Sequence, residues 1–299
     1  MNLDTKEFLY PGHAFCPGCG FMIGLRTVLK VMGENTVTAI TAGCLGTNSG
    51  LFPSSPIKIA AYNTVFESAA AAASGIRAAL DMKGKGETNV MAIAGDGGTF
   101  DIGLQALSAA AERNENFIFL CYDNEGYMNT GIQKSSATPW GAWTTTTPQG
   151  MLKSSHKKNM LEIMALHRIP YAATACIAYP EDLVRKVERA KTIQGLRFLH
   201  LLVSCPSGWK FSPDKTIRMA RLAVETRIFP LYEVMDGEHY ELSLDPGYHP
   251  AKEYIRAQAR FQYLSDEEVD EIQKEADRSW ERLLKKVSPP KDKRPGRKT

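Results

Sequence analysis

Short apolar runs alternate with stretches of helical periodicity along most of the chain. The apolar runs are typical of buried strands and cover residues 36–41, 91–94, 117–122, 171–177 and 197–203. Helical periodicity or helix-start signals mark residues 22–32, 65–75, 101–113, 159–168, 180–191 and 214–225. Strands that alternate with helices form a parallel sheet covered on both faces. We therefore predict an α/β fold with a doubly wound, mostly parallel sheet.

Four further segments complete the expected organisation. Residues 46–56 are rich in Gly, Ser and Pro and are expected to form a loop, and residues 135–150 lack periodicity and are expected to form a long ordered loop. A hairpin is expected around Asp236-Gly237. The charged segment 266–286 predicts a helix, and a basic tail follows it. We expect residues 1–260 to form the main domain and residues 261–299 to add the charged helix and tail.

The run Ala94-Gly95-Asp96-Gly97-Gly98 follows one apolar strand, and Asp123-Asn124 ends the next. The carboxyl ends of parallel strands meet at one edge of a sheet, so Asp96 and Asn124 should lie close together despite 28 intervening steps along the chain. Their oxygen atoms, beside a Gly-rich backbone, suit Mg²⁺ that bridges a diphosphate. The alternative is that Gly-Asp-Gly is only a strand-to-turn signal.

The six cysteines fall into two groups. Cys121 and Cys176 lie inside apolar strands, where Cys acts as a small buried hydrophobic residue. The other four lie in turn-like contexts: Cys16, Cys19, Cys44 and Cys205. Four thiolates suit a tetrahedral zinc ion or an iron–sulfur cubane, and spacing alone does not choose between them. A CxxC pair also allows a redox dithiol, although no strand leads directly into this one.

Composition limits the classes of protein that fit. The chain has 299 residues, with 43% hydrophobic and 23% charged residues, as expected for a soluble globular protein. The formal net charge is only +3, and much of the basic excess lies in the tail, which argues against nucleic-acid binding. We find no apolar run of membrane-spanning length and no signal-peptide pattern. A cytoplasmic protein without membrane association is expected.

Several motifs together resemble the β subunit of the pyruvate:ferredoxin oxidoreductase family. The matching segments are CPGCG, AGC, FESAAAAASG, IAGDGGTFDIGLQALSAAAERN, CYDNEGYMNTGIQKSSATPWGAWTTTTP, AYPEDLVRKV and CPSGW. The resemblance covers about residues 10–260 and implies a thiamine-diphosphate-binding fold for the main domain. It also implies oxidative decarboxylation of pyruvate, or of a related 2-oxoacid, with coenzyme A as acyl acceptor and ferredoxin as electron acceptor.

The resemblance assigns roles to individual residues near the cofactor. It implies that Mg²⁺ is held by side-chain oxygens of Asp96 and Asn124 and by the backbone carbonyl of Gly126. It implies that three glycines let the diphosphate approach the backbone: Gly95, Gly97 and Gly98. Asn129 would face the reactive thiazolium ring and the bound oxoacid, as a catalytic residue. From the residue pattern alone, a turn-forming Asn is the alternative for Asn129.

The resemblance also assigns the cysteines and the residues that follow the third of them. It implies that a [4Fe–4S] cluster is bound close to the cofactor by Cys16, Cys19, Cys44 and Cys205. The segment that begins at Cys44, with Leu45 and Thr47, would lie beside the thiazolium ring.

The resemblance implies partner subunits, because this chain lacks groups that the reaction needs. In the family, the glutamate that activates the thiamine ring belongs to the α subunit. Glu67, within the Ala-rich helix predicted here, is the rival within this chain. The chain lacks the C-x₂-C-x₂-C-x₃-C-P run of ferredoxin domains, so electrons would leave through a ferredoxin-like subunit to ferredoxin. We expect a complex with α-, γ- and δ-type subunits, and an inactive isolated chain.

The identity of the substrate stays open at this point. Residues 45–58 are smaller and more polar than the corresponding stretch of pyruvate-type members, and this difference could alter the substrate pocket. Pyruvate itself is therefore in doubt. Oxalate, whose oxidation needs no coenzyme A, is the alternative substrate. A non-oxidative thiamine-dependent decarboxylase or synthase would use the same diphosphate unit. A zinc-stabilised scaffold subunit with a vestigial Mg²⁺ site is the non-enzymatic alternative.

Overall fold

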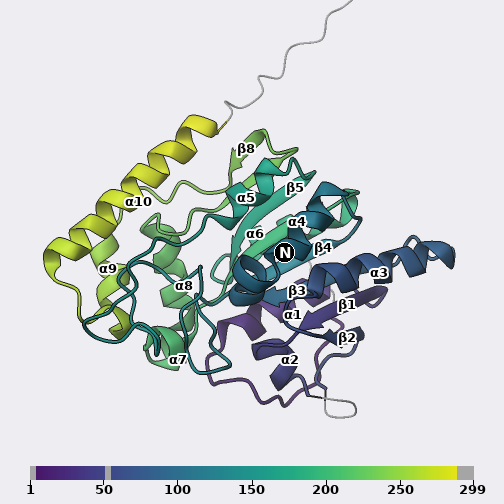
Figure 1. Cartoon of the computed structure of the whole chain (residues 1–299), viewed down its shortest axis with the longest axis horizontal. Coiled ribbons are helices and arrows are strands. Elements are labelled where there is room, and N and C mark those ends of the chain that lie inside the picture. Colours follow the sequence, from purple (N-terminus) through teal and green to yellow (C-terminus); the bar gives the residue numbers. More distant parts are fainter. Residues whose placement is uncertain (1–4, 51–54, 288–299) are drawn as a thin grey trace, which may run out of the picture.

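One mixed sheet of eight strands runs through the molecule, in a computed structural model that describes residues 5–50 and 55–287 (Figure 1). The strand order is β2-β1-β3-β4-β6-β5-β7-β8. The strands are β1 (Thr36–Thr41), β2 (Ala60–Thr64), β3 (Asn89–Gly95), β4 (Ile118–Asp123), β5 (Tyr171–Cys176), β6 (Arg197–Leu202), β7 (Tyr232–Met235) and β8 (His239–Leu242). The six strands from β2 to β5 in this order pair in parallel, and β7 and β8 add an antiparallel edge. The predicted mostly parallel sheet is confirmed.

Helices cover both faces of this sheet. They are α1 (Gly20–Met32), α2 (Cys44–Asn48), α3 (Ala69–Met82), α4 (Leu104–Glu112), α5 (Met160–Leu166), α6 (Pro180–Thr192), α7 (Pro206–Trp209), α8 (Thr216–Glu225), α9 (Ala251–Arg256) and α10 (Asp266–Lys286). Short helices of other types are the π-helix η1 (Gly97–Ile102) and the 3₁₀-helices η2 (Pro213–Lys215) and η3 (Ala259–Phe261).

Two hydrophobic cores, one on each face of the sheet, follow from the alternation of side chains along the strands. In β4, Ile118 and Leu120 belong to one core and Phe119 and Cys121 to the other, as the two-residue period of a strand requires. Helices α1, α6, α8 and α9 pack into the first core, and α3, α4, α5 and α10 pack into the second. The doubly wound arrangement is therefore confirmed, and α10 is part of it through Trp280.

The predicted hairpin and the charged C-terminal helix are present, as β7–β8 and α10. The segment 135–150 forms turns with one isolated bridge, between Thr144 and Thr147, and no helix or regular strand. Cys121 and Cys176 are fully buried in β4 and β5, as expected. Within the described residues, no helix has both the length and the apolar character needed to cross a membrane.

Some expected boundaries were wrong. The Ala-rich helix begins at Ala69 and not at residue 65, because residues 65–68 close a turn in which the Ser68 amide donates to the Val65 carbonyl. Glu67 therefore lies exposed in that turn and not on the helix. The helix expected from residue 101 is α4, and the π-helix η1 precedes it. Residues 46–48, expected to be loop, belong to α2, whereas residues 51–54 and the tail 288–299 lie outside the described residues.

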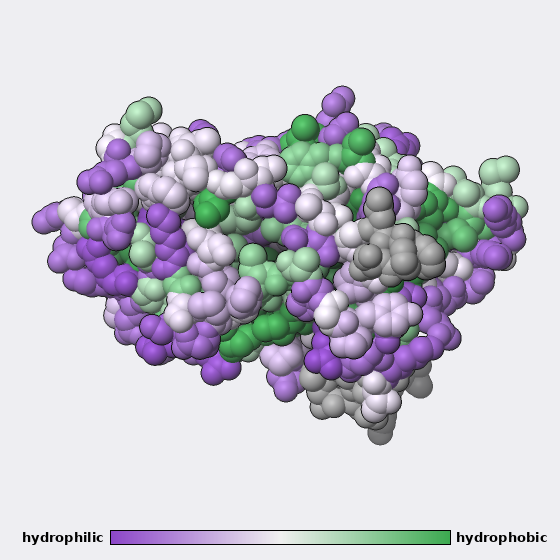
Figure 2. Space-filling model, turned by 90° about the horizontal axis from the view of Figure 1, so that it is seen from below, coloured by the Kyte–Doolittle hydropathy of each residue, from purple (hydrophilic) through white to green (hydrophobic). Residues whose placement is uncertain are grey.

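The ends of the molecule differ in character. In Figure 1, α9 and α10 lie at one end and α3 and β2 at the other. Figure 2 shows the face that carries α2 and α7, with hydrophobic side chains gathered around a hollow near its centre and a mostly hydrophilic end over α9 and α10. That central region is where the carboxyl ends of the inner strands bring the candidate site residues together.

Candidate active site

The candidate site lies at the carboxyl ends of four neighbouring parallel strands, β1, β3, β4 and β6. Cys44 follows β1, Asp96 follows β3, Asn124 follows β4 and Cys205 follows β6. The chain reverses its winding direction between β1 and β3, since β2 lies on the other side of β1. Ligands of open α/β sheets bind at such switch points. The fold therefore brings the predicted metal and cysteine residues to one edge.

Asp96, Asn124 and Gly126 converge as predicted. The backbone N–H of Asn124 donates to Asp96 Oδ1 at 3.3 Å. One terminal atom of the Asn124 side chain lies 2.9 Å from both Asp96 Oδ1 and the Gly126 carbonyl oxygen. With Oδ1 in that position, the Asn124 side chain, Asp96 and the Gly126 carbonyl offer three oxygens to a hard divalent cation. With Nδ2 there, the Asn124 side chain instead donates to Asp96 Oδ1 and to the Gly126 carbonyl, which satisfies both oxygens without a cation. The donor set fits Mg²⁺.

The environment of Asp96 also favours a cation. Its carboxyl is fully buried, and Oδ2 accepts a hydrogen bond of 2.5 Å from the Ser135 hydroxyl. Burial, and next the neighbouring charge of Asp123, raise the pKa of Asp96 well above its usual range. A bound cation would reverse this shift because it favours the carboxylate. Ser135, in the long loop after β4, was missed by sequence reasoning.

Gly97 allows a close ring contact. A Cβ at Gly97 would lie 2.4 Å from the ring of Tyr127, whose hydroxyl donates to Asp101 Oδ2 at 3.0 Å. At Gly98 an added Cβ would meet nothing closer than 3.4 Å. At Gly95 the ring of Tyr122 would lie 3.1 Å away. Two of the three predicted diphosphate glycines are thus also needed for aromatic packing, and Gly98 leaves the most room.

Three of the four turn cysteines lie at the beginnings of helices. Cys19 precedes α1, Cys44 begins α2 and Cys205 precedes α7, where the Gly208 amide donates to its sulfur at 3.4 Å. Amide groups at a helix start stabilise negative charge, such as that of a thiolate. Cys16 is exposed at the rim of this group.

Close backbone packing joins the Cys16–Cys19 loop to the Cys205 segment. The Gly20 amide donates to the Ser204 carbonyl at 3.2 Å, and a Cβ at Gly20 would lie 2.7 Å from that oxygen. Gly18 has a φ of +70°, and a Cβ there would lie 2.6 Å from the Pro213 carbonyl. The Thr216 hydroxyl donates to the Gly18 carbonyl at 2.6 Å. The glycines of the CPGCG motif thus bring cysteines from the two ends of the fold together.

Burial and mutual repulsion oppose ionisation of the thiols. Burial raises the pKa of Cys44 to about 12 and that of Cys205 to about 11, and the negative charges of the other thiolates add to both shifts. Thiols in this setting need a cation to ionise. In the described residues, no three His, Cys, Asp or Glu side chains meet closely enough for a single metal ion. Four Cys thiolates are ligands that suit a [4Fe–4S] cluster or a tetrahedral zinc ion, so the chemistry of this donor set fits a cubane.

Direct contacts link the cysteine group to the metal loop. Asn124 Nδ2 lies 4.0 Å from Cys44 Sγ, in the orientation that turns Asn124 Oδ1 towards Asp96. Asn129 Nδ2 donates to Thr47 Oγ1 at 3.1 Å, and both residues are exposed at the edge. The Leu45 side chain is fully buried in the first core, so only its backbone is available to a cofactor. The predicted contributions of Asn129, Leu45 and Thr47 stay predictions.

A buried ion network behind the metal loop was not predicted. Lys157 Nζ lies 2.5 Å from Asp123 Oδ2 and 2.8 Å from Glu125 Oε1. Arg260 Nη2 lies 2.6 Å from Glu125 Oε2, and His200 Nε2 lies 2.7 Å from Asp123 Oδ2. Burial opposes ionisation of Asp123, but Lys157 and His200 outweigh it and lower its pKa to about 2.

This network determines the shape of the metal loop. Glu125 stands between Asn124 and Gly126, has a positive φ of 67° and is 3% exposed. The left-handed conformation is costly for a residue with a side chain, and the two ion pairs hold it there. Trp209 Nε1 also donates to the Asn124 carbonyl at 2.8 Å. The loop is therefore anchored from both sides.

Comparison with known proteins identifies the family. Residues 41–201 match the family described as thiamine pyrophosphate enzyme, C-terminal TPP binding domain. The chain is 49% identical over 280 residues to pyruvate synthase subunit PorB of Methanothermobacter marburgensis, covering 93% of this chain and 97% of that protein. It is 47% identical over 295 residues to ketoisovalerate oxidoreductase subunit VorB of Pyrococcus furiosus, covering 95% of each.

A solved structure has a similar fold. It is the 2-oxoglutarate:ferredoxin oxidoreductase from Magnetococcus marinus, with a TM-score of 0.59 and 20% identity over 74% of this chain and 82% of that chain. The fold and the sequence relatives agree with the resemblance noted in the motifs. The chain belongs to the β-subunit family of the 2-oxoacid:ferredoxin oxidoreductases, within the thiamine pyrophosphate enzymes.

Proposed function

We propose that this chain holds thiamine diphosphate, Mg²⁺ and a [4Fe–4S] cluster side by side, and oxidises pyruvate or a closely related 2-oxoacid with coenzyme A and ferredoxin. The observation that carries the proposal is the placement of Cys44, Asp96, Asn124 and Cys205 after four adjacent strands. Bound there, the thiamine group supplies an electron sink for decarboxylation, and the cluster supplies a one-electron acceptor.

Each group has donors in the chain. Asp96, Asn124 and Gly126 would hold Mg²⁺, because their oxygens converge when Asn124 turns its Oδ1 towards Asp96 and Gly126. Gly98, and to a smaller extent Gly95 and Gly97, would admit the diphosphate. The cluster would be held by the four turn cysteines, three of which begin helices: Cys16, Cys19, Cys44 and Cys205. Buried thiols that resist ionisation become good ligands once a cation is present.

Partner subunits complete the proposal. The described residues place Glu67 in an exposed turn, and we propose that the activating glutamate comes from an α-type subunit. A ferredoxin-like subunit would receive electrons from the local cluster and pass them to ferredoxin, within an assembly of α-, γ- and δ-type chains in the cytoplasm. We propose that electrons leave the cluster on the side of Cys16, which is exposed.

Asn129 is proposed to face the substrate, and its replacement separates catalysis from metal binding. We expect Asn129→Ala to lower the turnover of the assembled complex about a hundredfold, or ~2.7 kcal/mol in the barrier, because its amide no longer orients the reacting groups. Mg²⁺ affinity should change less than about twofold, since Asn129 is not in the proposed donor set. Steady-state kinetics and Mg²⁺ titration test this, with Asn63→Ala on the exposed strand β2 as control. Equal loss of turnover and Mg²⁺ affinity would make Asn129 structural.

A substrate panel on the co-purified complex tests the reaction. The relatives named for pyruvate and ketoisovalerate favour these two acids, each dependent on coenzyme A. Pyruvate, 2-oxoisovalerate, 2-oxobutyrate, 2-oxoglutarate and oxalate are compared with and without coenzyme A by reduction of a viologen dye. Oxalate oxidation without coenzyme A would favour the alternative substrate. Carbon dioxide release without dye reduction would favour a non-oxidative enzyme, and a colourless, zinc-containing complex that takes up no thiamine diphosphate would favour a scaffold.

A further inference from the structure

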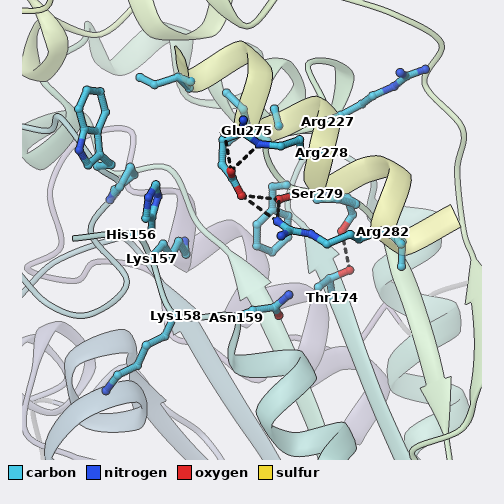
Figure 3. Close-up of a pocket in the computed structure, with 18 of the residues that line it drawn as sticks. His156, Lys157, Lys158, Asn159, Thr174, Arg227, Glu275, Arg278, Ser279 and Arg282 are labelled. Atoms are coloured by element: carbon cyan, nitrogen blue, oxygen red, sulfur yellow. Dashed lines mark hydrogen bonds and ion pairs between the residues drawn. The ribbon is translucent and has the colours of Figure 1, made fainter. Parts of the chain in front are cut away.

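A cavity lies between α10 and the sheet, behind the metal loop, which it meets at Glu125, Lys157 and His200 of the buried ion network. It has a volume of 910 Å³, within the range of small-molecule sites. Its roof is α10, and the rest of its lining comes from the segments after β4 and α8, from α5, α9 and η3, and from strands β5, β6 and β7 (Figure 3). The proposed oxidoreductase reaction makes no use of this space.

The interior of the cavity is apolar and aromatic. The residues that give it this character are Trp140, Ile228, Phe229, Tyr232, Tyr254, Ile255, Phe261, Ile272, Ala276 and Leu283. They come from six parts of the fold, so the apolar lining is a property of the assembled tertiary structure and not of one helix face. A ligand with an apolar ring or branched chain would bury its surface here, at roughly 25 cal/mol per Å².

The polar lining is positively charged. Seven Lys and Arg side chains line the cavity against four Glu, and His156 adds a further nitrogen-bearing ring. On α10, Glu275 is shared by two guanidinium groups: Arg278 Nη2 lies 2.9 Å and Arg282 Nη2 lies 2.8 Å from its carboxylate oxygens. Figure 3 shows these side chains gathered at the roof, above Thr174 and Asn159. One carboxylate between two cations leaves an excess positive charge at the opening.

Three other cations of the lining have partners within the chain. Lys158 donates to the Phe100 carbonyl at 2.6 Å, and Lys286 pairs with Glu162. Lys157, with its two ion pairs to Asp123 and Glu125, closes the inner end. Arg227 has a positive φ of 60°, and its buried Nε has no hydrogen-bond partner in the part of the chain that the structure describes. Arg227 is thus the lining cation with an unsatisfied nitrogen inside the cavity, whereas Arg278 and Arg282, whose side chains are 57% and 65% exposed, are the cations that an anion meets first from solvent.

We propose that this cavity binds a small organic anion whose apolar body lies in the aromatic interior and whose carboxylate or other acidic group pairs with Arg282 at the rim. The excess of positive over negative side chains favours an anion. The single carboxylate of Glu275 cannot neutralise both Arg278 and Arg282, so an acid at this opening gains an arginine partner. The apolar interior selects an organic acid over an inorganic one, because a small hydrated anion leaves that surface exposed to water. The proposal is independent of the reaction proposed for the strand-end site.

Calorimetric titration of the purified complex tests the site with two matched probes. 4-Phenylbutyrate carries an apolar body and a carboxylate, and 4-phenylbutan-1-ol carries the same body without charge. We expect saturable binding of the acid at one site per chain, and at least tenfold weaker binding of the alcohol. Arg282→Glu should weaken the acid at least tenfold. Arg218→Glu makes the same charge change at an exposed position of α8 outside the cavity, and should change the affinity for the acid less than twofold.

A filling substitution gives an independent arm. Ala276→Trp places a large ring in the cavity from the buried face of α10 and should abolish binding of both probes. Arg282 is well exposed, so its replacement tests the site even if the filling variant misfolds. Absence of saturable binding by the acid, equal affinity of the acid for wild type and Arg282→Glu, or equal losses in Arg282→Glu and Arg218→Glu would each overturn the proposal.

Discussion

Asp96→Ala should abolish binding of Mg²⁺ and thiamine diphosphate by the assembled complex and lower 2-oxoacid oxidation about a thousandfold or more, ~4 kcal/mol in the barrier. Asp96 is the one carboxylate in the proposed donor set, and its Oδ1 lies within 2.9 Å of the Asn124 side-chain atom that points to Gly126. Without it, two neutral oxygens remain, which hold a divalent cation weakly.

The fold should survive this change. The buried Asp96 carboxyl has only two hydrogen-bond partners in the described residues, the Ser135 hydroxyl and the Asn124 amide, and burial opposes its charge. Thiamine content and Mg²⁺ titration of the purified complex give the measurement, with circular dichroism to confirm folding. Asp270→Ala, at an exposed position of α10, is the control and should retain full thiamine content. Normal thiamine content in Asp96→Ala would show that Mg²⁺ and diphosphate are held elsewhere.

Glu125→Ala should destabilise the metal loop by about 3–5 kcal/mol, the usual result of removing one partner from a buried ion pair. Arg260 is only 2% exposed, and without Glu125 it keeps a hydrogen bond to Gln258 but no carboxylate. Hydrogen exchange of residues 124–128 in the complex, followed by mass spectrometry, should accelerate roughly a hundredfold to several thousandfold, as 3–5 kcal/mol implies. Mg²⁺ affinity should fall with it, because Glu125 separates two of the proposed donors.

Two further variants separate this effect from a general loss of charge. Glu125→Gln keeps the length and the hydrogen-bonding oxygen and should recover part of the protection. Glu238→Ala removes an exposed carboxylate whose ion pair with Arg168 spans 3.9 Å, and it should cost less than about 1 kcal/mol. Unchanged exchange in Glu125→Ala would mean that the Trp209 contact alone holds the loop.

The fold was largely predictable because five of the eight strands are interior strands of the sheet and are buried on both faces. They are β1, β3, β4, β5 and β6. Such strands appear in the sequence as continuous apolar runs. Strand β2 was missed because it is an edge strand whose side chains are almost all exposed, so Ala60–Thr64 shows no apolar run. The short helices α7 and α9 were missed because four or six residues do not establish a helical period.

The parts of the site that follow from parallel strand topology were predictable from the sequence. Asp96 and Asn124 meet because their strands β3 and β4 are parallel neighbours, which alternation of strands and helices already implies. The grouping of Cys16 with Cys205 depended on the family motifs, because no local pattern links the two ends of a chain. The ion network could not be predicted from the sequence. Its members Lys157, Arg260 and His200 are single residues in loops or strands, and their buried partners are evident only in the tertiary structure.

The most direct test of the central claim is the iron content of the complex with and without the fourth cysteine ligand. Cys205→Ala is compared with Cys176→Ala, which removes a fully buried thiol in β5 far from any proposed ligand role. In complexes prepared without air, we predict that Cys205→Ala loses up to one cubane of iron and acid-labile sulfide per chain and keeps its thiamine diphosphate, whereas Cys176→Ala keeps both. Equal iron and sulfide in the Cys205→Ala and wild-type complexes would contradict the account.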